Sequence, residues 1–303
     1  MSTDDRTIAA YLVDAFTDDP LAGNPAGVVP DADDLTDEQR QQIANELGAS
    51  ETAFVSTADE AEFRLSYFTP ETEVDLCGHA TVATFAHLFD RGDLETGAHT
   101  VETNTGTLAF SVDEDGTVWL TPNRPEIRPA ECTHERVADA LGVDVASLRD
   151  VGADLPLSTG DAGASFLLVP VNYFEHLRDA SPDMGAIADL SEDLDVDGVY
   201  AFTFDTLDAE ATLHGRAFAP RDGVPEDPVT GTASAAVSEY LVREGALDAD
   251  IEEVVCEQGH FLDRPGRVRV DVSGEVRIGG RAVTVLDGSL LVPEDSDDDI
   301  IEV

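Results

Sequence analysis

The sequence repeats itself about halfway along its length, and this repeat limits the folds open to the chain. The segment GHATVATFAHLFDRGDL at 78–94 resembles GTASAAVSEYLVREGAL at 231–247. The offset between the copies stays constant and still holds where Gly106 falls on Gly259. Such self-similarity predicts an ancient duplication that produced two similar halves related by a pseudo-two-fold axis.

Both halves share the same local pattern. An extended apolar segment, EFRLSYFTP or ATLHGRAFAP, leads to a loop and then to a helix of about fourteen residues that begins at a glycine. The first helix is small or apolar from Ala80 to Leu88, which predicts burial on most sides. We therefore expect an α+β protein of two pseudo-symmetric domains, each a curled, mostly antiparallel sheet around a central helix.

Turn signals separate the strands that follow each helix. Asp115-Gly116 predicts a hairpin turn in the first half, and Ser273-Gly274 and Gly279-Gly280 predict two turns in the second. Composition suggests the domain boundaries. We predict a first half at 1–121, a proline-rich linker at 122–130, a second half at 131–293 whose last strands could return to the first, and an acidic tail at 294–303.

A further helix is marked by its ends. In LTDEQRQQIANELG, Thr36 is the expected N-cap, Gln39 completes a capping box and Gly48 ends the helix. The apolar strand SETAFV follows. Glu51 is therefore expected at a junction between a helix and a strand.

The charge of the chain is extreme. Sixty-four acidic residues oppose seventeen basic residues, all of them Arg, for a formal net charge of −47. The acids are spread along the chain, and molar salt shortens the Debye length to about 3 Å, so we interpret them as a surface adapted to a salt-rich cytosol. The sequence has no basic patch for nucleic acid.

The sequence shows neither a targeting signal nor a cysteine pattern typical of disulfide bonds. No signal peptide and no apolar run of roughly 18 residues is evident, so we expect a cytoplasmic protein without membrane contact. Cys77, Cys132 and Cys256 are too few and too widely spaced for a disulfide framework.

The stretch DLCGHAT places Cys77 and His79 close together, and three interpretations are open. A structural zinc site needs four ligands close together, and the other histidines are scattered, so we expect no metal. A cysteine nucleophile with His79 as base is weakly indicated, since this spacing does not aim one side chain at the other. The third interpretation is a carboxylate site at helix N-termini, where Gly78 and Gly231 offer free N–H groups and Thr232 adds a hydroxyl donor. The pseudo-two-fold would bring both N-termini to one cleft.

Several segments together resemble a known family. VDAFTDDPLAGNPAGVV, SETAFV, FTPETEVDLCGHAT, EDPVTGTAS and EQGHFLDRP, in this order, look like the phenazine-biosynthesis PhzF-like isomerases. The resemblance implies the diaminopimelate epimerase fold and a homodimer. It also implies an isomerase without a cofactor, in which a glutamate moves a proton within a dihydro-hydroxyanthranilate.

The resemblance also implies site residues. Carried over to this sequence, the catalytic residues are Glu51, His79 and Asp227, and the substrate-binding residues are Asn24, Gly78, Gly231 and Thr232. The family often has serine where this chain has Thr232. A carboxylic acid whose pKa is raised by burial would suit the transfer of a proton within a small carboxylate.

Two alternatives stay open. Diaminopimelate-type racemases use one cysteine before each helix; Cys77 stands at the first position, but DPVTGT has no cysteine at the second. A thiol pair is therefore not available, and we interpret Cys77 as a small buried residue rather than a nucleophile. The other alternative is a module that binds a small carboxylate without turning it over.

Overall fold

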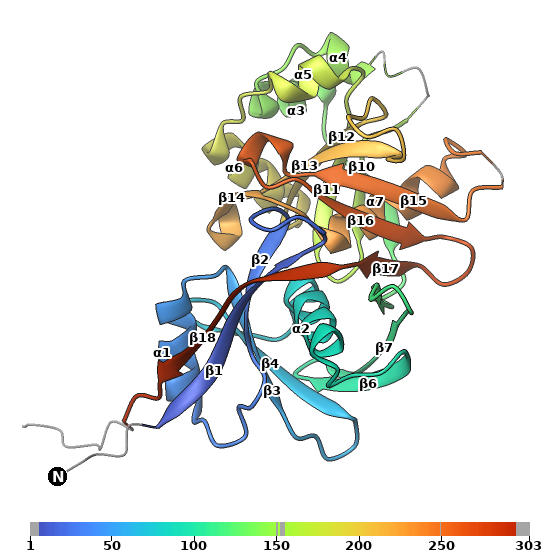
Figure 1. Ribbon diagram of the computed structural model, residues 1–303. Coiled ribbons are helices and arrows are strands. Elements are labelled where there is room, and N and C mark those ends of the chain that lie inside the picture. The colour runs from blue at the N-terminus through green and yellow to red at the C-terminus, as the bar shows by residue number, and fades with distance from the viewer. Residues whose placement is uncertain (1–5, 150, 152–154, 249, 295–303) are drawn as a thin grey trace, which may run out of the picture. The chain divides into compact units, whose positions relative to one another are not determined.

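The computed structural model describes residues 6–149, 151, 155–248 and 250–294, which fall into two compact units (Figure 1). The first unit comprises Met1–Leu21, Pro25–Val118 and Arg281–Val303, and the second comprises Ala22–Asn24 and Trp119–Gly280. The first unit is thus discontinuous in sequence. The acidic tail predicted at 294–303 lies outside the described residues, apart from Glu294.

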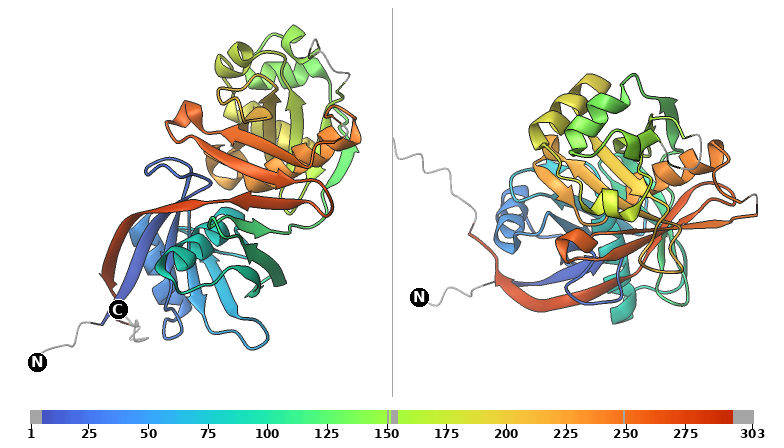
Figure 2. Two further views of the ribbon diagram at one scale, coloured as in Figure 1. Left: turned by 45° about the vertical axis from the view of Figure 1, so that its right-hand side comes forward. Right: turned by 90° about the horizontal axis from the view of Figure 1, so that it is seen from above.

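The strands of the first unit pair in the order β18-β1-β2-β3-β4-β6-β7, with the short β5 added to β4. Figure 2 shows β1 and β18 running side by side. The pairs β2–β3 and β4–β6 are parallel. The strands are β1 (Thr7–Ala15), β2 (Asn24–Val29), β3 (Glu51–Ser56), β4 (Phe63–Phe68), β5 (Glu73–Val74), β6 (Gly97–Thr103), β7 (Gly106–Val112) and β18 (Ala282–Leu291).

Two helices make the crossovers that parallel pairs require. Helix α1 (Asp37–Leu47) joins β2 to β3, and its predicted capping box and terminating Gly48 are confirmed. Helix α2 (Gly78–Arg91) joins β4 to β6 and packs against β1, β3, β7 and β18. Every residue from Ala80 to Leu88 is buried, as the apolar pattern predicted. The sheet therefore wraps around α2.

The second unit has the same arrangement. Its strands pair in the order β9-β10-β11-β12-β13-β15-β16, with β14 added to β13, and β11–β12 and β13–β15 are the parallel pairs. The strands are β9 (Glu126–Pro129), β10 (Ser158–Asp161), β11 (Ser165–Pro170), β12 (Gly198–Thr203), β13 (Leu213–Ala219), β14 (Val224–Asp227), β15 (Glu253–Gln258), β16 (Gly266–Asp271) and β17 (Arg277–Gly280). A further strand, β8 (Val118–Leu120), spans the boundary between the units.

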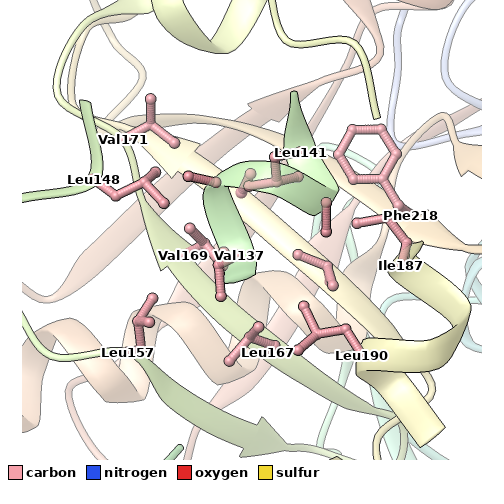
Figure 3. Packing of buried hydrophobic residues seen from close by; sticks show 14 of the residues in the cluster. Val137, Leu141, Leu148, Leu157, Leu167, Val169, Val171, Ile187, Leu190 and Phe218 are labelled. Atoms are coloured by element: carbon pink, nitrogen blue, oxygen red, sulfur yellow. The ribbon is translucent and has the colours of Figure 1, made fainter. Parts of the chain in front are cut away.

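Helix α7 (Gly231–Arg243) takes the central position in the second unit and packs against β9, β10, β11, β16 and β17. Other helices join β9 to β10 and β11 to β12, and with these strands they enclose a hydrophobic core around Val137, Leu167 and Phe218 (Figure 3). These helices are α3 (His134–Leu141), α4 (Ala146–Arg149), α5 (Phe174–Arg178) and α6 (Met184–Leu194), and two 3-10 turns, Pro220–Asp222 and His260–Leu262, complete the unit.

The expected fold class is confirmed: the protein is α+β, with a sheet curved around one central helix in each unit. The sheets are mixed, because each unit contains two parallel strand pairs. Both units use one strand order, whereas the ancient duplication itself stays a prediction. No helix in the described part of the chain combines the length and the apolar character that crossing a membrane requires.

Two local expectations differ from the structure. The segment predicted as a linker contains β9, which pairs with β10 in the second unit. The Gly279-Gly280 pair is not a turn but the end of β17, which pairs with β16. Gly279 has another role, because a Cβ there would lie 2.5 Å from the ring of Trp119.

Replacing Gly279 by alanine should therefore destabilise the protein by about 1–3 kcal/mol, as overpacking of a filled site does. Trp119 is the only tryptophan of the chain, so its fluorescence reports the change directly during urea unfolding. Gly274→Ala is the matched control, because a Cβ there would meet nothing within 4 Å. Equal stability of the two variants would contradict the steric role of Gly279.

Candidate active site

A carboxylate and an imidazole meet where β3 begins and α2 starts. Oε2 of Glu51 lies 3.2 Å from Nε2 of His79, and the Ser50 hydroxyl oxygen lies 3.3 Å from the same nitrogen. The side chains of Glu51 and His79 are 22% and 13% exposed. Oε2 of Glu51 is inaccessible to solvent. Its polar neighbours are the His79 ring and the Ser50 hydroxyl, whose hydrogen bonds favour the ionised carboxylate.

Glu51 and His79 each shift the pKa of the other towards the charged form. Burial alone would raise the pKa of Glu51, but the neighbouring His79 ring and the Ser50 hydroxyl outweigh it and leave the pKa below its usual value. Burial would lower the pKa of His79, but the hydrogen bonds of its ring to the Cys77 sulfur and to Glu51, together with the negative charge of Glu51, raise it above the usual value. The raised Glu51 pKa considered from the sequence is therefore wrong. The resting pair is a carboxylate beside an imidazolium.

Cys77 is the third member of the cluster. Its Sγ lies 3.4 Å from Nδ1 of His79, and the residue is buried as expected. Burial raises the pKa of this thiol, so it is protonated at neutral pH and is a poor nucleophile. Among the residues that the structure describes, Glu51, Cys77 and His79 form the one group of three metal-type donors whose ligand atoms lie within 4.8 Å of one another.

The start of α2 is open to an anion. Its N-cap, Cys77, makes no side-chain capping hydrogen bond, and its first turn contains no acidic residue. By contrast, α1 is capped by Thr36 and has Asp37 and Glu38 in its first turn. The N–H groups at Gly78 and His79 are thus placed at the positive end of a helix. This N-terminus can receive a carboxylate.

The second unit brings Asn24 and Asp227 together, although they are far apart in sequence. The Asn24 amide donates to Oδ1 of Asp227 at 2.9 Å and also to the carbonyl of Val229. The Thr230 hydroxyl donates to Oδ2 of Asp227 at 2.5 Å. The Asp227 carboxylate is thereby oriented by a donor on each of its oxygens.

Helix α7 begins beside this carboxylate. Like α2 it lacks a side-chain cap, because the Thr230 hydroxyl is directed to Asp227, and its first turn also contains no acidic residue. Gly231 and Thr232, both half-buried, lie in this first turn. Thr230 occupies the position before α7 that Cys77 occupies before α2, so a thiol is missing there.

Sequence reasoning missed one residue that supports this region. The Gln258 amide donates to the carbonyl of Asp227 at 2.7 Å and to the hydroxyl oxygen of Thr230 at 3.1 Å, while its oxygen accepts from the Thr230 N–H at 3.3 Å. Gln258 is 1% exposed. It belongs to the EQGHFLDRP segment used for the resemblance, and that segment was the available signal.

A buried histidine network was also missed. Nδ1 of His214 lies 2.7 Å from Oε1 of Glu257, and the Glu257 carboxylate also accepts from the backbone N–H groups of Leu207 and Asp208. Both side chains are essentially inaccessible. The rings of His214 and His260, which looked scattered in the sequence, have centroids 5.0 Å apart. This network supports β13 and β15, the strands that lead into α7 and away from it.

Comparison with known proteins shows the family of the chain. A family model described as "Phenazine biosynthesis-like protein", PhzC-PhzF, matches residues 13–288. The chain belongs to this family. A PhzC-PhzF relative from Bacillus subtilis, "Uncharacterized isomerase YfhB", is 36% identical over 286 residues, which is 93% of this chain and 95% of the relative. "Uncharacterized isomerase YddE" of Escherichia coli K12 is 34% identical, with 90% and 95% covered.

Solved structures agree with this assignment. A Bacillus anthracis protein described as a phenazine biosynthesis protein of the PhzF family has a TM-score of 0.86 at 35% identity, and the match covers 95% of this chain and all of that one. A hydroxyproline epimerase from Agrobacterium vitis has a TM-score of 0.58 at 12% identity over 96% and 94% of the two chains. The second likeness shows the fold alone. The PhzC-PhzF family and the epimerase-like fold expected from the sequence are both confirmed.

Proposed function

We propose that the chain is an isomerase that moves a proton within a small carboxylate-bearing molecule, with Glu51 as the group that takes and returns the proton. The buried carboxylate oxygen of Glu51, 3.2 Å from Nε2 of His79, supports this most directly. The relatives named as isomerases are consistent with the assignment.

The charge state of the pair determines the order of steps. The ionised Glu51 first removes a proton from one carbon of the substrate, and the resulting electron pair is delocalised over the substrate. The Glu51 carboxylic acid then returns the proton to another carbon, which regenerates the carboxylate. The imidazolium of His79 stabilises the negative charge as it develops. No redox change and no net gain or loss of protons occurs, so the scheme requires no cofactor.

The remaining site residues are assigned binding roles in the same proposal. Carboxylate binding is assigned to each helix start, to the N–H group at Gly78 in α2 and to the N–H group at Gly231 with the Thr232 hydroxyl in α7, since neither helix has a side-chain cap or an acidic residue in its first turn. Asp227, oriented by Asn24, accepts from an amine or hydroxyl group of the substrate. In a chain with 64 acids, two helix starts without acids favour an anionic ligand.

The direct test is incubation with dihydro-hydroxyanthranilate in molar KCl, in D2O, with absorbance to follow its loss and mass spectrometry to follow deuterium uptake. Turnover with uptake of solvent deuterium supports the proposal. Tight binding without turnover or exchange, across a panel of small amino and aromatic acids, would favour the non-catalytic binding module instead.

The pH dependence of kcat/KM should follow the ionisation of Glu51 and His79. The acid limb should lie below the usual glutamate pKa of about 4.3, because Glu51 must be ionised, and the alkaline limb above the usual histidine value of about 6.5, because His79 must be protonated. In His79→Gln the alkaline limb should disappear while some activity remains. An unchanged alkaline limb in that variant would refute the role of the imidazolium.

A further inference from the structure

Two buried hydroxyl groups lie behind the first turn of α2. The Thr81 hydroxyl donates to the carbonyl of Cys77 at 2.7 Å, and the backbone N–H of Thr81 donates to the same oxygen at 3.1 Å. The hydroxyl oxygen of Tyr67, on β4, lies 2.7 Å from that of Thr81. Both residues are fully buried. The carbonyl at the N-cap of α2 thus has two donors, and a tyrosine contacts one of them.

The direction of these hydrogen bonds follows from their number. Since the Thr81 hydroxyl uses its hydrogen on the carbonyl of Cys77, Tyr67 is the donor to Thr81. Burial raises the pKa of Tyr67, so its hydroxyl keeps the proton that it donates. Hydrogen bonds in such a chain polarise and strengthen one another in a buried site. The chain from Tyr67 through Thr81 therefore fixes the backbone at Cys77.

The position of Cys77 affects the active site in two ways. Its Sγ lies 3.4 Å from Nδ1 of His79, and this contact is one of the causes that raise the pKa of His79. The N–H groups at Gly78 and His79, at the positive end of the helix, follow it directly in the chain. A shift of the Cys77 backbone would disturb both.

The start of α7 contains the same bond. The Ser234 hydroxyl donates to the carbonyl of Thr230 at 2.8 Å, and Ser234 follows Thr230 by four residues, as Thr81 follows Cys77. Burial raises the pKa of Tyr200, on β12, and the Ser234 hydroxyl beside it acts in the opposite direction. Each central helix thus begins with a buried hydroxyl bonded to its N-cap carbonyl and a buried tyrosine next to that hydroxyl.

The two tyrosines come from different strands of corresponding pairs. Tyr67 on β4 lies opposite Ala53 of β3, whereas Tyr200 on β12 lies opposite Ala217 of β13. In the strand order of the two units, β3 and β4 correspond to β12 and β13. A copied sequence alone would keep the tyrosine on one strand, so its recurrence beside each helix start favours a requirement at that position.

We propose that Tyr67 and Thr81 are positioning residues of the isomerase, which fix the start of α2 and so keep Cys77 in contact with His79. Their effect on turnover rests on the function proposed above, whereas their effect on the His79 ring does not. A bond from a hydroxyl to the carbonyl four residues back does not by itself stabilise a helix. The value of this bond therefore lies in the geometry of the first turn.

Thr81→Val tests the proposal, because valine has nearly the shape of threonine but no hydroxyl. We expect the pKa of the His79 ring, followed by NMR in molar KCl, to fall towards the usual histidine value. We also expect kcat/KM to fall by about 10–10²-fold, with its alkaline limb moved to lower pH. Thr81→Ser keeps a hydroxyl and should restore both. The His79 signal is assigned by its absence in His79→Gln, and its titration needs no substrate.

Thr84→Val is the matched control. The Thr84 hydroxyl makes the same bond to the carbonyl of Ala80 at 2.7 Å in the same helix and is equally buried, but it does not reach the N-cap. This variant should leave the pKa of His79 and kcat/KM unchanged. Tyr67→Phe, which removes only the first donor of the chain, takes the place of Thr81→Val if that variant is not folded.

Three results would overturn the proposal, even if thermal unfolding shows a loss of stability. They are an unchanged His79 pKa in Thr81→Val and Tyr67→Phe, an equal shift in Thr84→Val, and an unchanged kcat/KM in a Thr81→Val variant of an active parent chain. If the pKa shifts as expected but the parent chain shows no isomerase activity on the substrate panel, the proposed function is refuted and the positioning of His79 stands.

Discussion

Glu51→Gln is expected to lower kcat by about 10²–10⁴, which corresponds to about 3–5.5 kcal/mol of activation free energy. Glutamine keeps the size of the side chain but cannot accept and return a proton. The fold should be unaffected, because the amide oxygen of glutamine can still accept from the neighbouring His79 ring or Ser50 hydroxyl. Steady-state kinetics on the turned-over substrate, together with thermal unfolding, separates a chemical loss from a structural one.

Glu62→Gln is a suitable control for this experiment. Glu62 also lies beside a histidine, with Oε2 2.7 Å from Nδ1 of His99, but it is half exposed on the surface of the same unit. Its removal should leave kcat within about twofold, as surface pairs contribute little. Near-normal turnover by Glu51→Gln would show that another group carries the proton, and the thiol of Cys77 would then be the next candidate for that role.

Glu257→Ala should lower the free energy of unfolding by about 3–5 kcal/mol. The Glu257 carboxylate accepts three hydrogen bonds in a buried site, one from His214 and two from the backbone at Leu207 and Asp208. Alanine leaves the buried His214 ring and the two part-buried backbone N–H groups without this acceptor. Urea unfolding in molar salt measures the loss.

Glu253→Ala provides the comparison on the same strand. Glu253 pairs with Arg269 at 2.8 Å in a partly exposed position, so its loss should cost about 0–1 kcal/mol. If the two variants unfold at the same urea concentration, the Glu257 network contributes no more to the free energy of unfolding than a surface ion pair does, which would contradict this prediction.

The central helices were predictable because their signals are local. The glycine that begins each central helix, the apolar run of α2 and the capping box of α1 each lie within a short window of sequence. The end of β17 was not predictable, because Gly279 is explained by contact with Trp119, far away in the chain. A pair of glycines commonly makes a turn, and here close packing against a ring requires the glycine instead.

The site was predictable only through the family pattern. Glu51 is one acid among 64, and nothing local distinguishes it; its contact with His79 depends on how β3 and α2 pack. Its pKa was misjudged for the same reason, since burial was evident from the strand pattern but the imidazole beside it was not. Gln258 and Glu257 were missed because buried polar networks depend on tertiary neighbours.

The pairing of β1 with β18 has a consequence for biosynthesis. Residues 7–15 are made before the second unit, but their partner, Ala282–Leu291, is made after it. The second unit is nearly continuous, so it can fold during translation, while β1 still lacks its partner β18. The first unit, which carries Glu51 and His79, is therefore completed only after the second unit has been made, and a chain truncated before Ala282 would have β1 paired with β2 alone.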